Sequence, residues 1–109
     1  MKYQVIKLDN RYSHRDQFKY MLEFSRNNKA GTGVRDYDQS CRWFNDHFGW
    51  SQDIDVRTAM IRNWTQHHHA YTHEDFNPVW AYCARYSEYR IYVATDKELE
   101  WFLLCHPQT

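Results

Sequence analysis

Four histidines in the polar stretch 66–77 are the residues whose chemistry stands out first in this sequence. Neutral imidazoles are the usual protein ligands of zinc and nickel, often with carboxylates as partners. His69 and His73 are four residues apart and would share one side of a helix, whereas His67 and His69 would share one side of a strand. The stretch lacks HExxH, the pattern of zinc-protease helices. A polar surface loop is therefore favoured, and a zinc or nickel site at His67, His69 and His73 is the alternative.

A second group of residues with binding chemistry is aromatic. It comprises Trp80, Tyr82, Tyr86 and Tyr92, with Arg90 beside them. Tyrosine, tryptophan and arginine are enriched at protein interfaces, and aromatic rings on an open sheet can stack on nucleic-acid bases. Three roles fit this group: a core under helices, an interface with a protein partner or a second copy, and a base-stacking surface.

The sequence offers no convincing catalytic set. The three cysteines, Cys41, Cys83 and Cys105, are an odd number without a CxxC motif, which indicates free thiols rather than a disulfide framework. Cys41 lies on the apolar stripe of a predicted helix, and Cys83 on the small-residue side of a predicted strand. Neither position favours a reactive thiolate. The close carboxylate pairs are better explained as charges at helix starts and on solvated surfaces, namely Asp53 with Asp55 and Glu98 with Glu100.

Length and composition indicate one small domain, residues 1–109. Aromatic residues make up 18% of the chain, with five Trp, nine Tyr and six Phe, which is more than a core of this size needs. Some of these rings should therefore lie on the surface or in an interface. Lysine plus arginine equals aspartate plus glutamate at 14 each, whereas a nucleic-acid binder usually has a basic surface.

The elements that would position these groups are first of all two neighbouring β-strands, at 79–86 and 90–95. In the first strand small or aliphatic residues alternate with aromatic ones, and in the second Ile91 and Val93 alternate with Tyr92. Successive side chains of a strand point to opposite faces of the sheet. We therefore expect a packed face and an aromatic face, with the rings of both strands on the same side.

Two more strands complete the predicted sheet of three to four mainly antiparallel strands. One covers 3–8, where apolar and polar residues alternate, and the other covers the apolar run 101–106, which ends at Pro107. The apolar residues at the end of the chain also have helical spacing. A single helix over 96–105 is therefore the alternative to the last strand.

Helices are predicted at 14–27 and 37–48, with a third at 53–64 where a strand also fits. Thr95 and Glu98 have the spacing of a capping box at the start of a further short helix. The expected architecture is a two-layer α+β domain with its helices on one face of the sheet.

The tail RIYVATDKELEWFLLCHP, residues 90–107, resembles the C-terminal ends of small uncharacterised proteins of marine tailed phages and ocean metagenomes. The segment 42–49, RWFNDHFG, is similar to those proteins as well. The resemblance implies a cytosolic protein made during infection. It implies no activity and no functional residue.

The chain contains no apolar run near the ~20 residues of a membrane span, and its start has no apolar signal-peptide core. We therefore expect a cytoplasmic protein. Its surplus of aromatic residues and its lack of a catalytic set favour a non-enzymatic binding module, acting through the aromatic sheet face as a homodimer or with a protein partner. The alternatives are a single-stranded nucleic-acid binder and a metal-binding protein that uses the histidine cluster.

Overall fold

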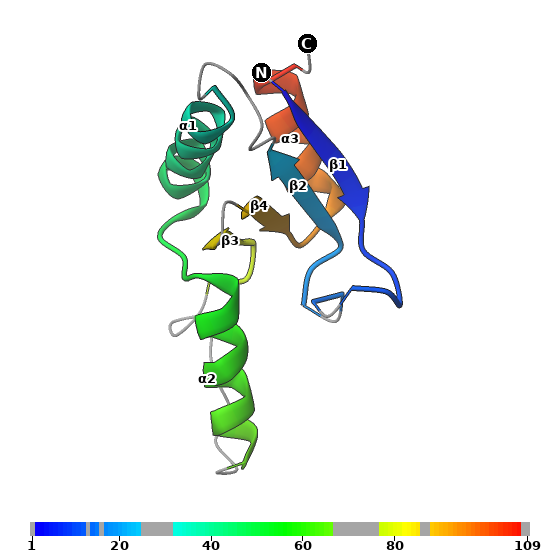
Figure 1. Cartoon of the computed structure of the whole chain (residues 1–109), viewed down its shortest axis with the longest axis vertical. Helices are drawn as coiled ribbons and strands as arrows, with labels where there is room; N and C mark the ends of the chain where they lie inside the picture. The colour runs from blue at the N-terminus through cyan, green and yellow to red at the C-terminus, as the bar shows by residue number, and fades with distance from the viewer. Residues whose placement is uncertain are drawn as a thin grey trace.

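The structure is a computed structural model that describes residues 2–12, 14–15, 17–24, 32–66, 77–85 and 88–107. Within these residues the chain forms an α+β fold, as predicted. Its elements in chain order are β1 (Tyr3–Lys7), β2 (Tyr20–Phe24), α1 (Thr32–Phe48), α2 (Ile54–Gln66), β3 (Trp80–Arg85), β4 (Glu88–Val93) and α3 (Asp96–Cys105) (Figure 1).

The four described strands form an antiparallel sheet in the order β1-β2-β4-β3. Two hairpins lie side by side, so β2 and β4 are central and β1 and β3 are the edges. Leu22 of β2 lies opposite Val5 on one side and Ile91 on the other. Because directly opposite residues share a face of the sheet, this register decides which side chains each face presents.

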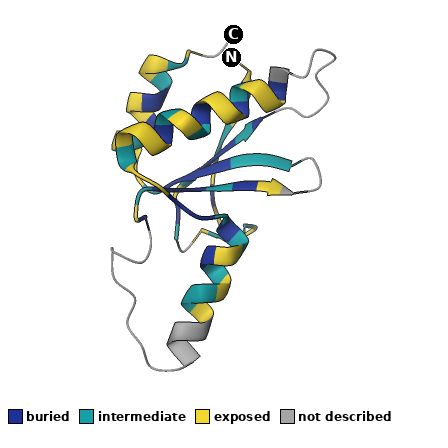
Figure 2. Ribbon diagram, turned by 90° about the vertical axis from the view of Figure 1, so that its left-hand side faces the viewer, coloured by how far each residue is buried: buried dark blue, intermediate teal, exposed yellow. Residues whose placement is uncertain are grey.

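One face of the sheet packs against α1 and α3 and carries the larger core. Phe44 of α1 is fully buried, with its ring 5.5 Å from the Trp80 ring and 5.2 Å from the Phe102 ring. Figure 2 shows α1 above the sheet, with buried positions on its inner side and exposed positions on its outer side. The buried residues of this core are Tyr3, Leu22, Phe24, Tyr37, Phe44, Trp80, Ile91, Val93, Leu99 and Phe102.

The opposite face of the sheet carries a smaller core. Its cover comes from the connection 8–19, through Leu8 and Phe18, and from Ile54 in the first turn of α2. Beyond that turn α2 extends away from the sheet, as Figure 1 shows. The molecule is correspondingly elongated, with dimensions of 47 × 28 × 25 Å.

The predicted helix 14–27 is wrong, because its centre is the strand β2. The apolar residues whose spacing suggested a helix are buried on both faces of the sheet. Leu22 belongs to the larger core, whereas Met21 belongs to the smaller one. A strand that is covered on both faces is apolar at consecutive positions, and such a run resembles a buried helix in sequence.

The predicted strand 101–106 is also wrong, and the alternative helix over 96–105 is confirmed as α3. Leu99 and Phe102, one turn apart, are its buried residues. Thr95 lies at the N-cap with an extended backbone, but its side chain makes no capping hydrogen bond, so the predicted capping box is wrong.

The other predicted elements are confirmed, with shifted ends. The strands 3–8, 79–86 and 90–95 correspond to β1, β3 and β4. The helix predicted at 37–48 begins earlier, at Thr32, and the uncertain segment 53–64 is the helix α2.

Candidate ligand-binding recess

The aromatic residues of β3 and β4 lie on two different faces of the sheet. Trp80 and Tyr82 lie opposite Val93 and Ile91, on the face that α1 and α3 cover. Tyr92 lies opposite Ala81 on the other face, and Arg90 opposite Cys83. The prediction of a single aromatic face is therefore wrong. The cause is the hairpin register, which pairs even-numbered residues of β3 with odd-numbered residues of β4.

Two of the predicted aromatic residues are core residues. Trp80 and Tyr92 are only 3% and 4% exposed, and the Trp80 indole donates a hydrogen bond to the Gly49 carbonyl at 2.9 Å. Tyr82 is half-buried. Tyr86 lies outside the described residues. Trp80 therefore has the first of the three roles considered for this aromatic group, that of a core residue under helices.

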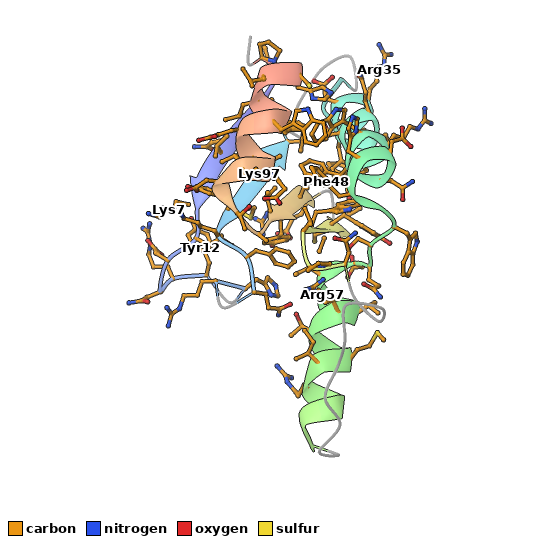
Figure 3. The ribbon with its side chains drawn as sticks, turned by 180° about the vertical axis from the view of Figure 1, so that it is seen from behind. Lys7, Tyr12, Arg35, Phe48, Arg57 and Lys97 are labelled. Atoms are coloured by element: carbon orange, nitrogen blue, oxygen red, sulfur yellow. The ribbon has the colours of Figure 1, made fainter. Side chains whose placement is uncertain are left out.

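Arg90 and Tyr92 belong instead to a recess on the face opposite α1. Its floor is formed by the sheet, one wall by the connection between β1 and β2, and the other wall by α2. The recess has a volume of about 420 Å³. Figure 3 marks the two walls, with Tyr12 on the connection and Arg57 near the start of α2 (Figure 3).

The floor of the recess is formed by buried, mainly apolar residues. Met21, Ile54, Cys83 and Tyr92 all line it, and all four are buried. Burial is the main cause that raises the pKa of Tyr92, which keeps the phenol protonated at neutral pH. The accessible lining of the recess is more polar than apolar, so a ligand would meet mainly polar groups, with a small apolar area at the floor.

Three arginines from three different segments line the recess, namely Arg11, Arg62 and Arg90. Arg11 forms an exposed ion pair with Asp9 at 3.1 Å, and its guanidinium lies 5.8 Å from the centre of the Tyr12 ring. Arg62 is exposed and has no ion-pair partner within the residues that the structure describes.

Arg90 is held more firmly than the other two arginines. Its guanidinium lies 3.1 Å from the carboxylate of Glu23 and 3.7 Å from that of Glu88. Glu88 and Asp55 also line the recess, so its rim carries both signs of charge. Arg62 is therefore the cation whose charge is least compensated by described neighbours.

Polar contacts tie the two walls together at one end of the recess. The His14 ring packs edge-on against Tyr92 at 5.3 Å between centroids, and its Nδ1 lies 3.5 Å from the Thr58 hydroxyl oxygen. Gln17 donates to the same hydroxyl oxygen at 3.2 Å and accepts from Arg57 at 3.0 Å. These contacts join the connection to α2 and fix the width of the recess at this end.

Sequence reasoning missed most of this site. It assigned residues 14–27 to a helix, which separated His14 from the sheet, and it gave no role to Arg11, Tyr12 or Arg62. The one local signal is the basic and aromatic run Arg11-Tyr12-Ser13-His14-Arg15. Only the register and the path of the chain bring Arg11, Tyr12 and His14 beside Arg90 and α2.

The structure bears on two chemistries that the sequence raised, a reactive thiol at Cys41 and a metal site. Burial raises the pKa of the Cys41 thiol to about 12, which keeps it protonated and unreactive at neutral pH. No group of three His, Cys, Asp or Glu within the described residues could hold a metal ion. The predicted metal ligands His67, His69 and His73 lie outside the described residues.

Comparisons with models of protein families, with curated proteins and with solved structures found no match to this chain. Within the described ranges, no helix has both the length and the apolar character needed to cross a membrane.

Proposed function

We propose that this protein is a non-enzymatic binding module whose ligand occupies the recess between α2 and the connection 8–19. The ligand is a small organic anion with an apolar part. The observation that carries this proposal is Arg62, a cation without a described ion-pair partner at the rim of a recess with an apolar floor. A volume of about 420 Å³ lies within the ~300–1,000 Å³ that is typical of small-molecule sites.

The chemistry of the recess divides the ligand into two parts. Apolar groups gain by leaving water for the small apolar area that Met21, Ile54 and Tyr92 leave accessible at the floor. A negative group gains a charge-assisted hydrogen bond from Arg62, and such bonds are worth about 1.5–3 kcal/mol. Asp55 and Glu88 on the same rim disfavour anions elsewhere in the recess, so they would restrict where the negative group lies.

The proposal is tested by isothermal titration calorimetry with phenyl phosphate and benzoate as probes. We expect binding of at least one of them in the micromolar to millimolar range, and a loss of about tenfold or more in Arg62→Gln, which corresponds to ~1.4 kcal/mol. Arg35→Gln is the matched control, because Arg35 is an exposed arginine on α1, away from the recess. The proposal fails if neither these two probes nor a larger organic phosphate binds at about 10 mM, or if Arg62→Gln binds as tightly as the wild type.

A second candidate function, association with a second copy of this chain, is favoured by a separate groove between α1 and the edge strand β3. The groove has a volume of about 480 Å³ and is mainly apolar, and Trp50 beside it is 70% exposed. The half-buried Tyr82 also lines it, which is consistent with the interface role predicted for this residue. Buried tryptophan and tyrosine dominate the energy of many interfaces.

The self-association is tested by light scattering between about 10 and 500 μM. We expect a dimer in the wild type and a monomer in Trp50→Ala. Leu104→Ala is the control, because Leu104 is 82% exposed on α3 and does not line the groove. A wild-type monomer throughout this range would exclude self-association as the function of the groove.

A further inference from the structure

We infer that the ligand of the recess is a single nucleotide, with its phosphate at the arginine rim and its base against Tyr12 and His14. This inference rests on the proposed function of the recess. It names the class of the anion, a phosphate monoester, and the class of the apolar part, a nucleobase.

Arginines from several directions line the recess, which suits a phosphate. Arg11, Arg62 and Arg90 belong to the connection, to α2 and to β4. Arg11 and Arg90 are also ion-paired with protein carboxylates, whereas Arg62 has no such partner among the described residues. A carboxylate has two oxygens in one plane and is satisfied by one guanidinium fork. A phosphate monoester has three terminal oxygens in a tetrahedral arrangement, so it can accept from several walls at once.

Neutral donors near the arginines suit the same group. The Thr58 side chain on α2 also lines the recess, as does the protonated phenol of Tyr92. The Thr58 hydroxyl already donates to the Ile54 carbonyl at 2.8 Å and accepts from Gln17. Its role is therefore to hold the wall in place, and the arginines supply the contacts to the anion.

Two rings of the connection suit a nucleobase. Tyr12 and His14 line the recess and are half-buried, and the Arg11 guanidinium lies 5.8 Å from the centre of the Tyr12 ring. The edge-on contact with Tyr92 holds the His14 ring in one orientation. Aromatic side chains stack on nucleobases because every base has a π-face. The small apolar area at the floor then contacts part of the base.

Charge and size argue for one nucleotide rather than a long strand or a duplex. The chain has equal numbers of acidic and basic residues, 14 each, and the rim of the recess includes Asp55 and Glu88. A second phosphate near either carboxylate would be repelled. A cavity of about 420 Å³ also lies near the lower end of the ~300–1,000 Å³ range of ligand sites.

The test is a calorimetric series on the full chain with AMP, UMP, adenosine, ribose 5-phosphate, phenyl phosphate and benzoate. We expect at least one of the two nucleotides to bind about tenfold or more tightly than every other probe, and its affinity to fall as the salt concentration rises. Arg62→Gln should reduce the affinity for that nucleotide about tenfold or more and leave the affinity for adenosine unchanged. Tyr12→Leu should lower the affinity for the nucleotide and for adenosine, and it should leave the affinity for ribose 5-phosphate unchanged.

Two controls keep these variants interpretable. Tyr12→Phe retains the ring and should bind like the wild type, and Arg35→Gln removes an arginine from α1 with no effect on binding. Circular dichroism and the urea midpoint show that each variant is folded. A 5′-phosphorylated tetranucleotide distinguishes the two sources of the ligand: affinity equal to that of the free nucleotide supports a strand terminus, and weaker binding supports a free nucleotide.

The failures of the two proposals differ. If benzoate or phenyl phosphate binds as tightly as both nucleotides, the recess is an anion site but the nucleotide inference is overturned. If none of the six probes binds, both proposals are overturned. If unphosphorylated oligonucleotides bind more tightly as they lengthen, the ligand is a strand and the assignment of a single nucleotide is wrong.

Discussion

Replacing Asn77 by alanine should destabilise the protein, because the Asn77 side chain forms hydrogen bonds that alanine cannot form. The buried Asn77 side chain joins the end of α1 to the start of β3. Its amide nitrogen lies 2.8, 3.2 and 3.1 Å from the carbonyl oxygens of Phe48, Gly49 and Trp50, and its amide oxygen accepts from the Val79 backbone N–H at 2.8 Å. Alanine removes both the amide nitrogen that donates to the carbonyls after α1 and the amide oxygen that accepts from Val79.

The magnitude follows from the groups that lose their partner. A buried polar group without a hydrogen bond costs about 1–3 kcal/mol, and the backbone N–H of Val79 and the carbonyls after α1 are both affected. We expect Asn77→Ala to lower the free energy of unfolding by about 3 kcal/mol. For a domain of this size, that corresponds to a fall in Tm of about 15 °C.

The assay is urea and thermal unfolding, followed by tryptophan fluorescence and circular dichroism. Asn45→Ala is the matched control, because Asn45 is exposed on α1 and alanine is the better helix former, so the change should stay within about 0.5 kcal/mol. Asn77→Asp separates the two halves of the link, since it keeps the acceptor but replaces the donor with an oxygen that faces three carbonyl oxygens.

Two results would refute this reasoning. A loss below about 1 kcal/mol in Asn77→Ala would show that water satisfies the exposed groups and that the side chain does not join α1 to β3. Full wild-type stability in Asn77→Asp at neutral pH would show that the bonds to the carbonyls of Phe48, Gly49 and Trp50 contribute nothing.

Two further predictions concern titratable groups. The hydrogen bond from the Tyr20 hydroxyl is the main cause that lowers the pKa of Asp96 below its usual range, and the hydrogen bond from Lys19 is the second cause. The Asp96 carboxylate therefore stabilises the fold at pH values above its unfolded pKa of ~3.9. This stabilisation is lost as the pH falls through the pKa of Asp96 in the folded protein. Urea midpoints between pH 6 and 2.5 should therefore converge for the wild type and Asp96→Asn at low pH, and parallel curves would contradict the assignment. Among the cysteines, iodoacetamide at pH 8 should alkylate the exposed Cys105 long before Cys41, whose pKa burial raises to about 12. Mass spectrometry of the labelled peptides measures this order, and equal rates at Cys41 and Cys105 would contradict it.

The sequence by itself determined the elements whose residue pattern is local. Alternation in 79–86 and 90–95 predicts strands because neighbouring side chains of a strand face opposite sides, and β3 and β4 confirm it. The stripe within 37–48 predicts a helix because it repeats with the helical period, and α1 confirms it. These local periods also suffice for the α+β class.

Tertiary structure alone decided which face each side chain meets. The span 20–24 is a strand because helices cover one face of β2 and the connection covers the other, and no local pattern separates that from a buried helix. Tyr92 and Trp80 lie on opposite faces of the sheet because of the register of the hairpin. A slip of one residue in this register would place them on the same face. The recess likewise exists only because the fold brings Arg11 and Arg62, 51 positions apart in the sequence, beside the same stretch of sheet. Register and packing are long-range properties, and the period of a short segment contains no information about them.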